Sequence, residues 1–189
     1  MTDLSGNGAT GLLAGATTTV AGKLGQALSF DGATNEVTVS NPPNLNIPAY
    51  TISGWFKTTN GAYQALIYEK YSTFNANQKV FISSNQISFD ASDDIGTSLD
   101  CSPPANLTDG TWHHFALVQT TTTTGKMYID DIVQCTSSGS VTSFSGSPNL
   151  FLGSDSNGSI KYTGSLDDVR IYNRALSPTD VARLYKLGH

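Results

Sequence analysis

Residues 162–177 read YTGSLDDVRIYNRALS and join a short strand to the start of a helix. From Asp168 to Tyr172, polar and apolar residues alternate, with Val169 and Ile171 on one face. A period of two is the pattern of a half-buried β-strand. The segment therefore predicts a strand that ends shortly before the C-terminus.

Asp167 takes an unusual position in this pattern. Continued back along the chain, the alternation places Asp167 on the inward, apolar face. An ionised carboxylate in that position needs a partner. Two kinds of partner are open: a hydrogen bond from Arg170, Arg174 or a backbone amide, or a hard cation.

The segment after the strand predicts a helix of about ten residues. Ser177 is a suitable N-cap, Pro178 suits the first helical position, and Asp180 completes a weak capping box. Gly188 suits the left-handed C′ position. An apolar stripe that must dock on the rest of the fold is formed by Val181, Leu184 and Tyr185.

Short β-type runs also recur through the rest of the chain, separated by turn signals. They predict strands at 27–30, 36–39, 50–57, 65–69, 79–83, 86–90, 112–119, 126–130, 132–135, 150–153 and 164–172. The threonine run 120–124 is predicted to be the tip of a hairpin. Many short strands of this kind indicate a sandwich or jelly roll, and we expect residues 1–189 to form a single domain.

Composition and charge exclude several classes of protein. Only 13% of the residues are charged, and there are two Glu and three Arg against 22 Ser and 23 Thr, which argues against an all-α fold. The net charge is −5 and no basic run exists, so nucleic acid is not expected as a partner. No apolar stretch approaches the roughly 20 residues of a membrane span, and no signal peptide is visible.

The quoted C-terminal segment resembles the signature of LamG-like jelly-roll domains in the concanavalin A-like lectin/glucanase superfamily. Five further blocks resemble that family in the same order. They are DLSGNG (3–8), GKLGQALSFDG (22–32), TISGWFK (51–57), DGTWHHFA (109–116) and MYIDD (127–131). The resemblance implies an all-β, two-sheet antiparallel jelly-roll sandwich with a short C-terminal helix.

The chain departs from the family at one turn, where Asp131 stands in place of the usual Gly. A two-residue primed hairpin turn requires positive φ, which Gly adopts freely and Asp at some cost. A longer turn or another turn type is therefore an open alternative here.

The resemblance also implies a structural Ca²⁺ between the N-terminal loop and the last strand. Side-chain oxygens for it would come from Asp3, Asn7, Asp31 and Asp167. The alternative is that Asp3 caps a turn and Asp31 forms an Asx-turn.

The two cysteines and the histidines leave further questions to the structure. Cys101 and Cys135 allow one disulfide or two separate thiols, and both interpretations are open. His113 and His114 are adjacent on a predicted strand and point to opposite faces, so a shared zinc ion is not expected.

Catalysis is not expected from this inventory of residues. A glycosidase needs two carboxyl groups flanking one bond, whereas Glu36 and Glu69 are 33 residues apart in the sequence. A non-catalytic module that binds carbohydrate is preferred. An aromatic and amide-rich segment suggests its site, at Tyr63, Tyr68, Tyr71, Phe74 and Asn75.

Two alternatives to a glycan-binding module remain. One is a structural or adhesion domain of a surface or phage virion protein with a protein partner, and the other is a degenerate glycoside hydrolase. In each case we expect part of a larger multidomain or particle protein located outside the cell, on its surface or on a virion, without membrane insertion.

Overall fold

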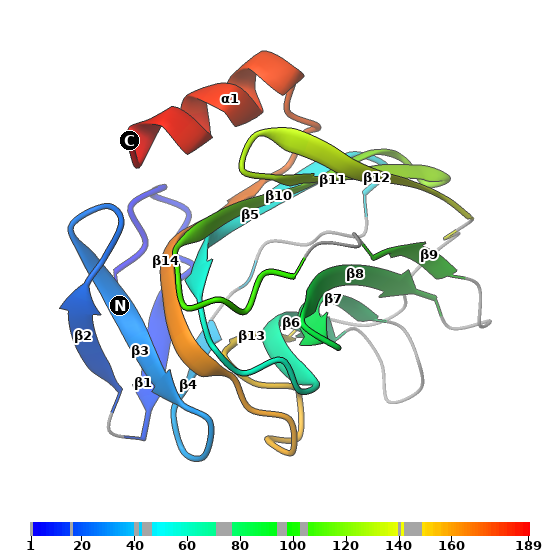
Figure 1. Ribbon diagram of the computed structural model, residues 1–189. Helices are drawn as coiled ribbons and strands as arrows, with labels where there is room; N and C mark the ends of the chain where they lie inside the picture. The colour runs from blue at the N-terminus through cyan, green and yellow to red at the C-terminus, as the bar shows by residue number, and fades with distance from the viewer. Residues whose placement is uncertain are drawn as a thin grey trace.

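Two antiparallel sheets lie face to face, and one short helix packs on the outer side of one sheet (Figure 1). This computed structural model describes residues 2–15, 17–39, 42, 47–70, 77–93, 98–102, 106–139, 141 and 149–189. The arrangement confirms the predicted all-β jelly-roll sandwich with a C-terminal helix.

The first sheet, called sheet A, has seven strands. In spatial order they are β1 (Gly11–Ala14), β4 (Glu36–Val39), β13 (Asn149–Leu152), β6 (Gln64–Lys70), β7 (Asn77–Ser83), β8 (Gln86–Ser92) and β9 (Ser98–Cys101).

The second sheet, called sheet B, also has seven strands. In spatial order they are β12 (Ile132–Ser138), β11 (Thr124–Ile129), β10 (His113–Thr121), β5 (Tyr50–Lys57), β14 (Thr163–Tyr172), β3 (Gln26–Asp31) and β2 (Thr18–Ala21).

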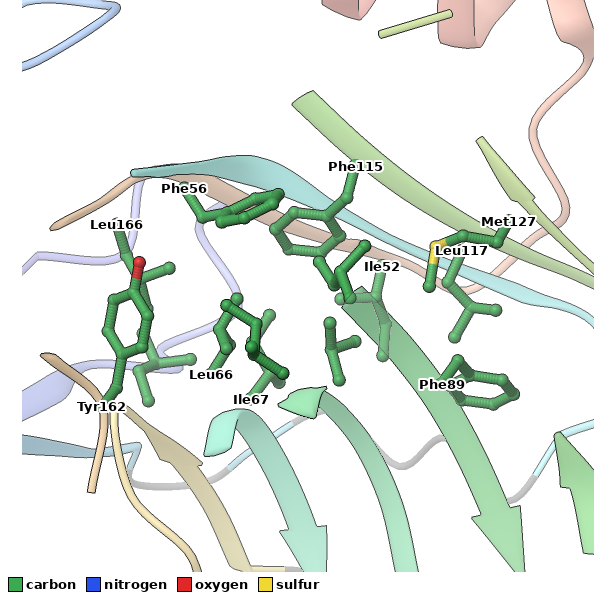
Figure 2. Packing of buried hydrophobic residues seen from close by; sticks show 14 of the residues in the cluster. Ile52, Phe56, Leu66, Ile67, Phe89, Phe115, Leu117, Met127, Tyr162 and Leu166 are labelled. Atoms are coloured by element: carbon green, nitrogen blue, oxygen red, sulfur yellow. The ribbon is translucent and has the colours of Figure 1, made fainter. Parts of the chain in front are cut away.

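The hydrophobic core fills the space between the sheets, as Figure 2 shows for part of it. Inward-facing residues of both sheets meet there, among them Ile52, Phe56 and Phe115 of sheet B and Ile67 and Phe89 of sheet A. Each of these side chains is at most 1% exposed. Burying one such side chain stabilises the fold by roughly 1.5–3 kcal/mol, so the core is the main source of stability.

All eleven predicted strands are present, and three strands were missed. The missed strands β1, β2 and β9 each lie at the edge of a sheet. Every residue of β2 is exposed, so its two faces do not differ and the sequence shows no alternation. The hairpin between β10 and β11 turns within the threonine run, as predicted.

The face predicted for Asp167 is wrong, because β14 contains a β-bulge. The pairing of β14 with β5 shifts between Asp167 and Arg170, and Asp168 has φ 48°. The bulge interrupts the period of two. Leu166 therefore lies in the core with Val169 and Ile171, and Asp167 pairs with Trp55 on the outer face of sheet B.

Helix α1 (Pro178–Leu187) covers part of that outer face (Figure 1). Its N-terminus has the predicted capping box, in which the Ser177 hydroxyl accepts a hydrogen bond from the Asp180 amide. A second apolar cluster lies beneath the helix and comprises Ala116, Val118, Tyr128, Leu176, Val181 and Leu184. Gly188 has φ −92°, so the predicted left-handed cap is wrong.

A disulfide joins the two sheets at one edge of the sandwich. Cys101 and Cys135 are bonded, with their Cα atoms 6.1 Å apart. Cys101 ends β9 and Cys135 lies in β12, and these are the edge strands of sheets A and B. Of the two open interpretations of the cysteines, the structure selects the disulfide.

Candidate functional site

The outer face of sheet A, away from the core, carries a group of aromatic side chains. Strand alternation places three of them, because residues next to each in its strand point into the core, and the fourth precedes β6 and contacts one of the three. We call this group the aromatic patch; it consists of Tyr63, Tyr68, Phe81 and Phe151. Tyr63 is 47% exposed and the other three are half-buried.

Strand register lines up the centre of this face into one row. Phe151 of β13 lies opposite Tyr68 of β6, Tyr68 opposite Lys79 of β7, and Lys79 opposite Asp90 of β8. With strands spaced about 4.8 Å apart, the row spans about 14 Å. Tyr63 and Phe81 extend it to one side, with their rings in an edge-to-face contact at 5.4 Å.

An ion pair lies among these rings. Lys79 Nζ is 2.7 Å from Asp90 Oδ2 and 5.2 Å from the centre of the Phe81 ring. Ser92 donates a further hydrogen bond to Asp90 across 2.6 Å. Burial alone would lower the pKa of Lys79, but the hydrogen bond and charge of Asp90 outweigh it and raise the pKa. The face thus combines apolar rings with fixed polar groups.

The structure brings together part of the predicted carbohydrate-binding set. Tyr63 and Tyr68 both belong to the aromatic patch, whereas Tyr71, Phe74 and Asn75 lie outside the described residues. Phe81 and Phe151 also belong to the aromatic patch, but they were not predicted from the sequence. The signal that could have found them is an aromatic residue at an outward position of a predicted strand.

Two of the predicted calcium ligands, Asp3 and Asn7, lie in the exposed N-terminal loop. The Asp3 carboxylate accepts hydrogen bonds from the amides of Ser5 and Ala9 and from the Ser5 hydroxyl. These bonds, led by that from the Ser5 amide, lower the pKa of Asp3. Asn7 Nδ2 donates to the Ser5 hydroxyl. The loop has the turn-capping geometry of the alternative interpretation.

The other two predicted ligands lie apart along the sheet. The Asp31 carboxylate accepts hydrogen bonds from the amides of Ala33, Thr34 and Asn35, which hold its pKa well below the usual range. Asp31 lies opposite Thr163 of β14, and Asp167 is four residues further along, about 13 Å away. Asp31 and Asp167 therefore cannot share one ion, and calcium binding itself stays a prediction.

The two adjacent histidines point to opposite faces, as predicted. His113 lies beside Phe56, and its ring Nδ1 is hydrogen-bonded to the Asp130 carboxylate at 2.8 Å, which raises the pKa of His113. His114 lies beside Trp55 under helix α1, and burial lowers its pKa to about 4. Within the described ranges, no three His, Cys, Asp or Glu side chains gather in a way that could hold a metal ion.

Comparisons with known proteins agree with this fold. Residues 31–182 match the family model described as the concanavalin A-like lectin/glucanases superfamily. A sequence comparison with curated proteins gives no match.

Solved structures similar to this chain include toxin binding domains. The binding domain of Paraclostridial Mosquitocidal Protein 1 has a TM-score of 0.77 at 18% identity, covering 97% of this chain and 48% of that one. The receptor binding domain of botulinum neurotoxin C/D mosaic serotype has a TM-score of 0.76 at 14% identity, covering 97% and 48%. The chain thus spans about half the length of these toxin domains.

One similar structure corresponds to nearly the whole chain. It is Domain 4 of AbnA, an extracellular arabinanase from Geobacillus stearothermophilus, in complex with arabinotriose, with a TM-score of 0.77 at 18% identity. The match covers 97% of this chain and 91% of that domain. At such identities these likenesses show the fold alone. In the described part of the chain, no helix is long and apolar enough to cross a membrane.

Proposed function

Since the chain belongs to the concanavalin A-like lectin/glucanases superfamily, we propose that it is a non-catalytic module that binds carbohydrate through the aromatic patch. The observation that carries this proposal is the row of Phe151, Tyr68, Lys79 and Asp90 across four neighbouring strands.

The chemistry of this face suits a sugar chain. Aromatic rings present flat apolar surfaces that can cover the C–H faces of sugar rings. Lys79 offers ammonium protons as donors and Asp90 offers carboxylate oxygens as acceptors, and both are suited to sugar hydroxyls. Because the two charges are 2.7 Å apart and compensate each other, we expect a neutral glycan rather than a charged one.

The positions of the two glutamates support a binding role rather than hydrolysis. Glu36 is ion-paired with Lys161. Glu69 is fully buried on the inner face of β6. The two carboxyl groups lie on opposite faces of sheet A, since the inward-facing Val37 and Val39 place Glu36 on the outer face, so they cannot flank one bound glycosidic bond.

The neighbouring structures support the same function and suggest a first ligand. Domain 4 of AbnA is in complex with arabinotriose, and the toxin neighbours are a binding domain and a receptor binding domain. We therefore expect this chain to act as an appended recognition unit of a larger protein outside the cell. Binding of a protein receptor is the alternative outcome.

The test is titration calorimetry with arabino-oligosaccharides, together with a glycan array. Tyr68→Ala and Phe81→Ala are each expected to weaken binding about tenfold or more, a loss of about 1.4 kcal/mol. Ile132→Ala, which removes a 62% exposed apolar side chain from sheet B, is the matched control and should bind like the wild type. Failure of the wild type to bind any glycan, or unchanged binding by both variants, would refute the proposal.

We also propose a structural Ca²⁺ ion that binds separately from the glycan. The residues available for it in the N-terminal loop are Asp3 and Asn7. If it binds there, Asp3→Asn should weaken the binding of Ca²⁺ in titration calorimetry without changing glycan binding by the aromatic patch.

A further inference from the structure

The inner faces of four strands change from apolar to polar at one end of the sandwich. In each strand, the residue two positions from a core aliphatic residue points to the same inner face of the sheet. The four polar residues reached in this way are Tyr50, two residues before Ile52; Glu69, two residues after Ile67; Gln78, two residues before Val80; and Gln119, two residues after Leu117. We call them the polar layer, and each is at most 3% exposed.

The members of the polar layer form one neighbouring pair in each sheet. Tyr50 lies directly opposite Gln119 in sheet B, and Glu69 directly opposite Gln78 in sheet A. Burial, together with the nearby charge of Glu69, raises the pKa of Tyr50 well above its ordinary value. This influence of Glu69 on Tyr50 indicates that the two residues, one from each sheet, lie at the same end of the sandwich.

Two oxygens of the layer have unmet hydrogen-bonding capacity. In the part of the chain that the structure describes, neither Tyr50 Oη nor Gln119 Oε1 has a hydrogen-bond partner. Each of these side chains is at least 97% buried and lies on the inner face. A buried polar group without a partner costs about 1–3 kcal/mol, so the site favours a ligand that both oxygens could contact.

The basic side chains described on the neighbouring strands are directed away from the polar layer. Lys79 points outward to Asp90, and Lys126 lies opposite Val118 on the helix side of sheet B. On β10 the inward-facing base is His113, six residues from Gln119 and about 20 Å away. Asp93, also fully buried, follows β8 at the same end and places a second carboxyl group there.

Stability alone does not explain such a layer. Replacing buried charged and polar groups by apolar residues of similar volume is often neutral or stabilising, and the next positions along these strands are aliphatic. A carboxylate, two amide oxygens and a hydroxyl are the kinds of ligand that hard cations prefer. We propose that the polar layer is a cation-binding site between the two sheets, with Glu69 as its charged ligand.

This site is distinct from both sites considered above. Glu69 follows Tyr68 directly in β6, but the two side chains point to opposite faces of sheet A. None of the four residues belongs to the predicted calcium set.

The test uses chelator-treated protein and measures the melting temperature with added Ca²⁺, Mg²⁺, Na⁺ or K⁺. At one hundred times its dissociation constant, the bound cation should raise the melting temperature by about 5–10 °C. Metal analysis after dialysis should find one equivalent of a cation that binds tightly. Glu69→Gln should lose this rise, because the site then has no charged ligand.

Tyr50→Phe provides a second variant that keeps the ring and removes only the hydroxyl. Without added cation it should melt a few degrees above the wild type, and its rise with cation should be smaller. Asp109→Asn is the matched control, because this exposed carboxylate lies just before β10, at the end away from Gln119, and it should keep the full rise. The proposal is overturned if no cation raises the melting temperature, if Glu69→Gln keeps the rise, or if Asp109→Asn abolishes it.

Discussion

Asp167 Oδ2 accepts a hydrogen bond from the amide of Leu24 across 2.7 Å, although 143 residues separate the two in the chain. The other carboxylate oxygen accepts the amide of Asp168 at 2.8 Å. Gly22 permits the close approach, since a Cβ there would lie 2.4 Å from Asp167 Oδ2. One carboxylate thus ties the turn between β2 and β3 to the last strand.

Asp167→Asn should therefore destabilise the fold. The amide side chain can accept only one of the two hydrogen bonds and presents a donor to the other amide. We expect the free energy of unfolding to fall by about 1–3 kcal/mol, measured by chemical denaturation. Asp168→Asn is the control, since the Asp168 side chain forms a half-exposed ion pair with Arg170 and should contribute at most about 1 kcal/mol. Equal losses in the two variants would contradict this role for Asp167.

His114 predicts a loss of stability in mild acid. Burial lowers its pKa from 6.5 to about 4. Between these two pH values, the histidine is protonated in the unfolded chain but neutral in the folded chain. The stabilisation is complete above pH 6.5 and is lost as the pH falls toward 4, on the order of 3 kcal/mol in total. His114→Phe should remove this part of the pH dependence in denaturation curves.

His113 provides the contrast to His114. Its pKa is raised, with the Asp130 hydrogen bond as the largest cause, so its contribution is complete below about pH 6.5 and is lost as the pH rises through the folded pKa. His113→Phe should therefore leave the acid loss in place. If His114→Phe has the same acid loss as the wild type, then His114 is not its source.

The turn between β11 and β12 predicts a stabilising substitution. Asp130 and Asp131 have φ of 50° and 68°, and Ile129 pairs with Ile132, so this is a two-residue primed turn that keeps Asp at both positions. Asp131→Gly should raise the free energy of unfolding by roughly 0.5–1 kcal/mol, because Gly adopts positive φ without strain.

Asp130→Gly tests the same turn and is expected to destabilise the fold, the opposite of the effect of Asp131→Gly. Asp130 accepts hydrogen bonds from the His114 amide and from the His113 ring. Their loss should outweigh the relief of backbone strain, so thermal denaturation should show that this variant melts below the wild type. Two variants that change stability in the same direction would argue against this account of the turn.

The disulfide predicts a measurable effect of reduction. It closes a loop with a sequence separation of 34, which by loop-closure entropy stabilises the fold by roughly 3–4 kcal/mol. The double variant Cys101→Ser/Cys135→Ser should lose about this much in chemical denaturation. A reductant should destabilise the wild type and leave the double variant unchanged, and an effect on both would indicate another cause.

Local chemistry explains which elements the sequence could predict. Strands such as β4 and β8 were found because one of their faces is buried, which produces the alternation of apolar and polar residues. Helix α1 was found because Ser177 and Asp180 accept hydrogen bonds from its first backbone amides and Pro178 has no amide to satisfy. Edge strands such as β2 were missed because exposed faces impose no such pattern.

The sequence by itself thus determined the all-β class, most strands and the C-terminal helix, because these depend on chemistry within a few neighbouring residues. Tertiary structure decided the face of Asp167, the pairing of Cys101 with Cys135, and the gathering of Tyr68, Phe81 and Phe151. These relationships depend on which strands become neighbours, in which register, and where a bulge reverses the alternation. These features are determined by contacts between residues far apart in the chain, and a local sequence pattern contains no information about such contacts.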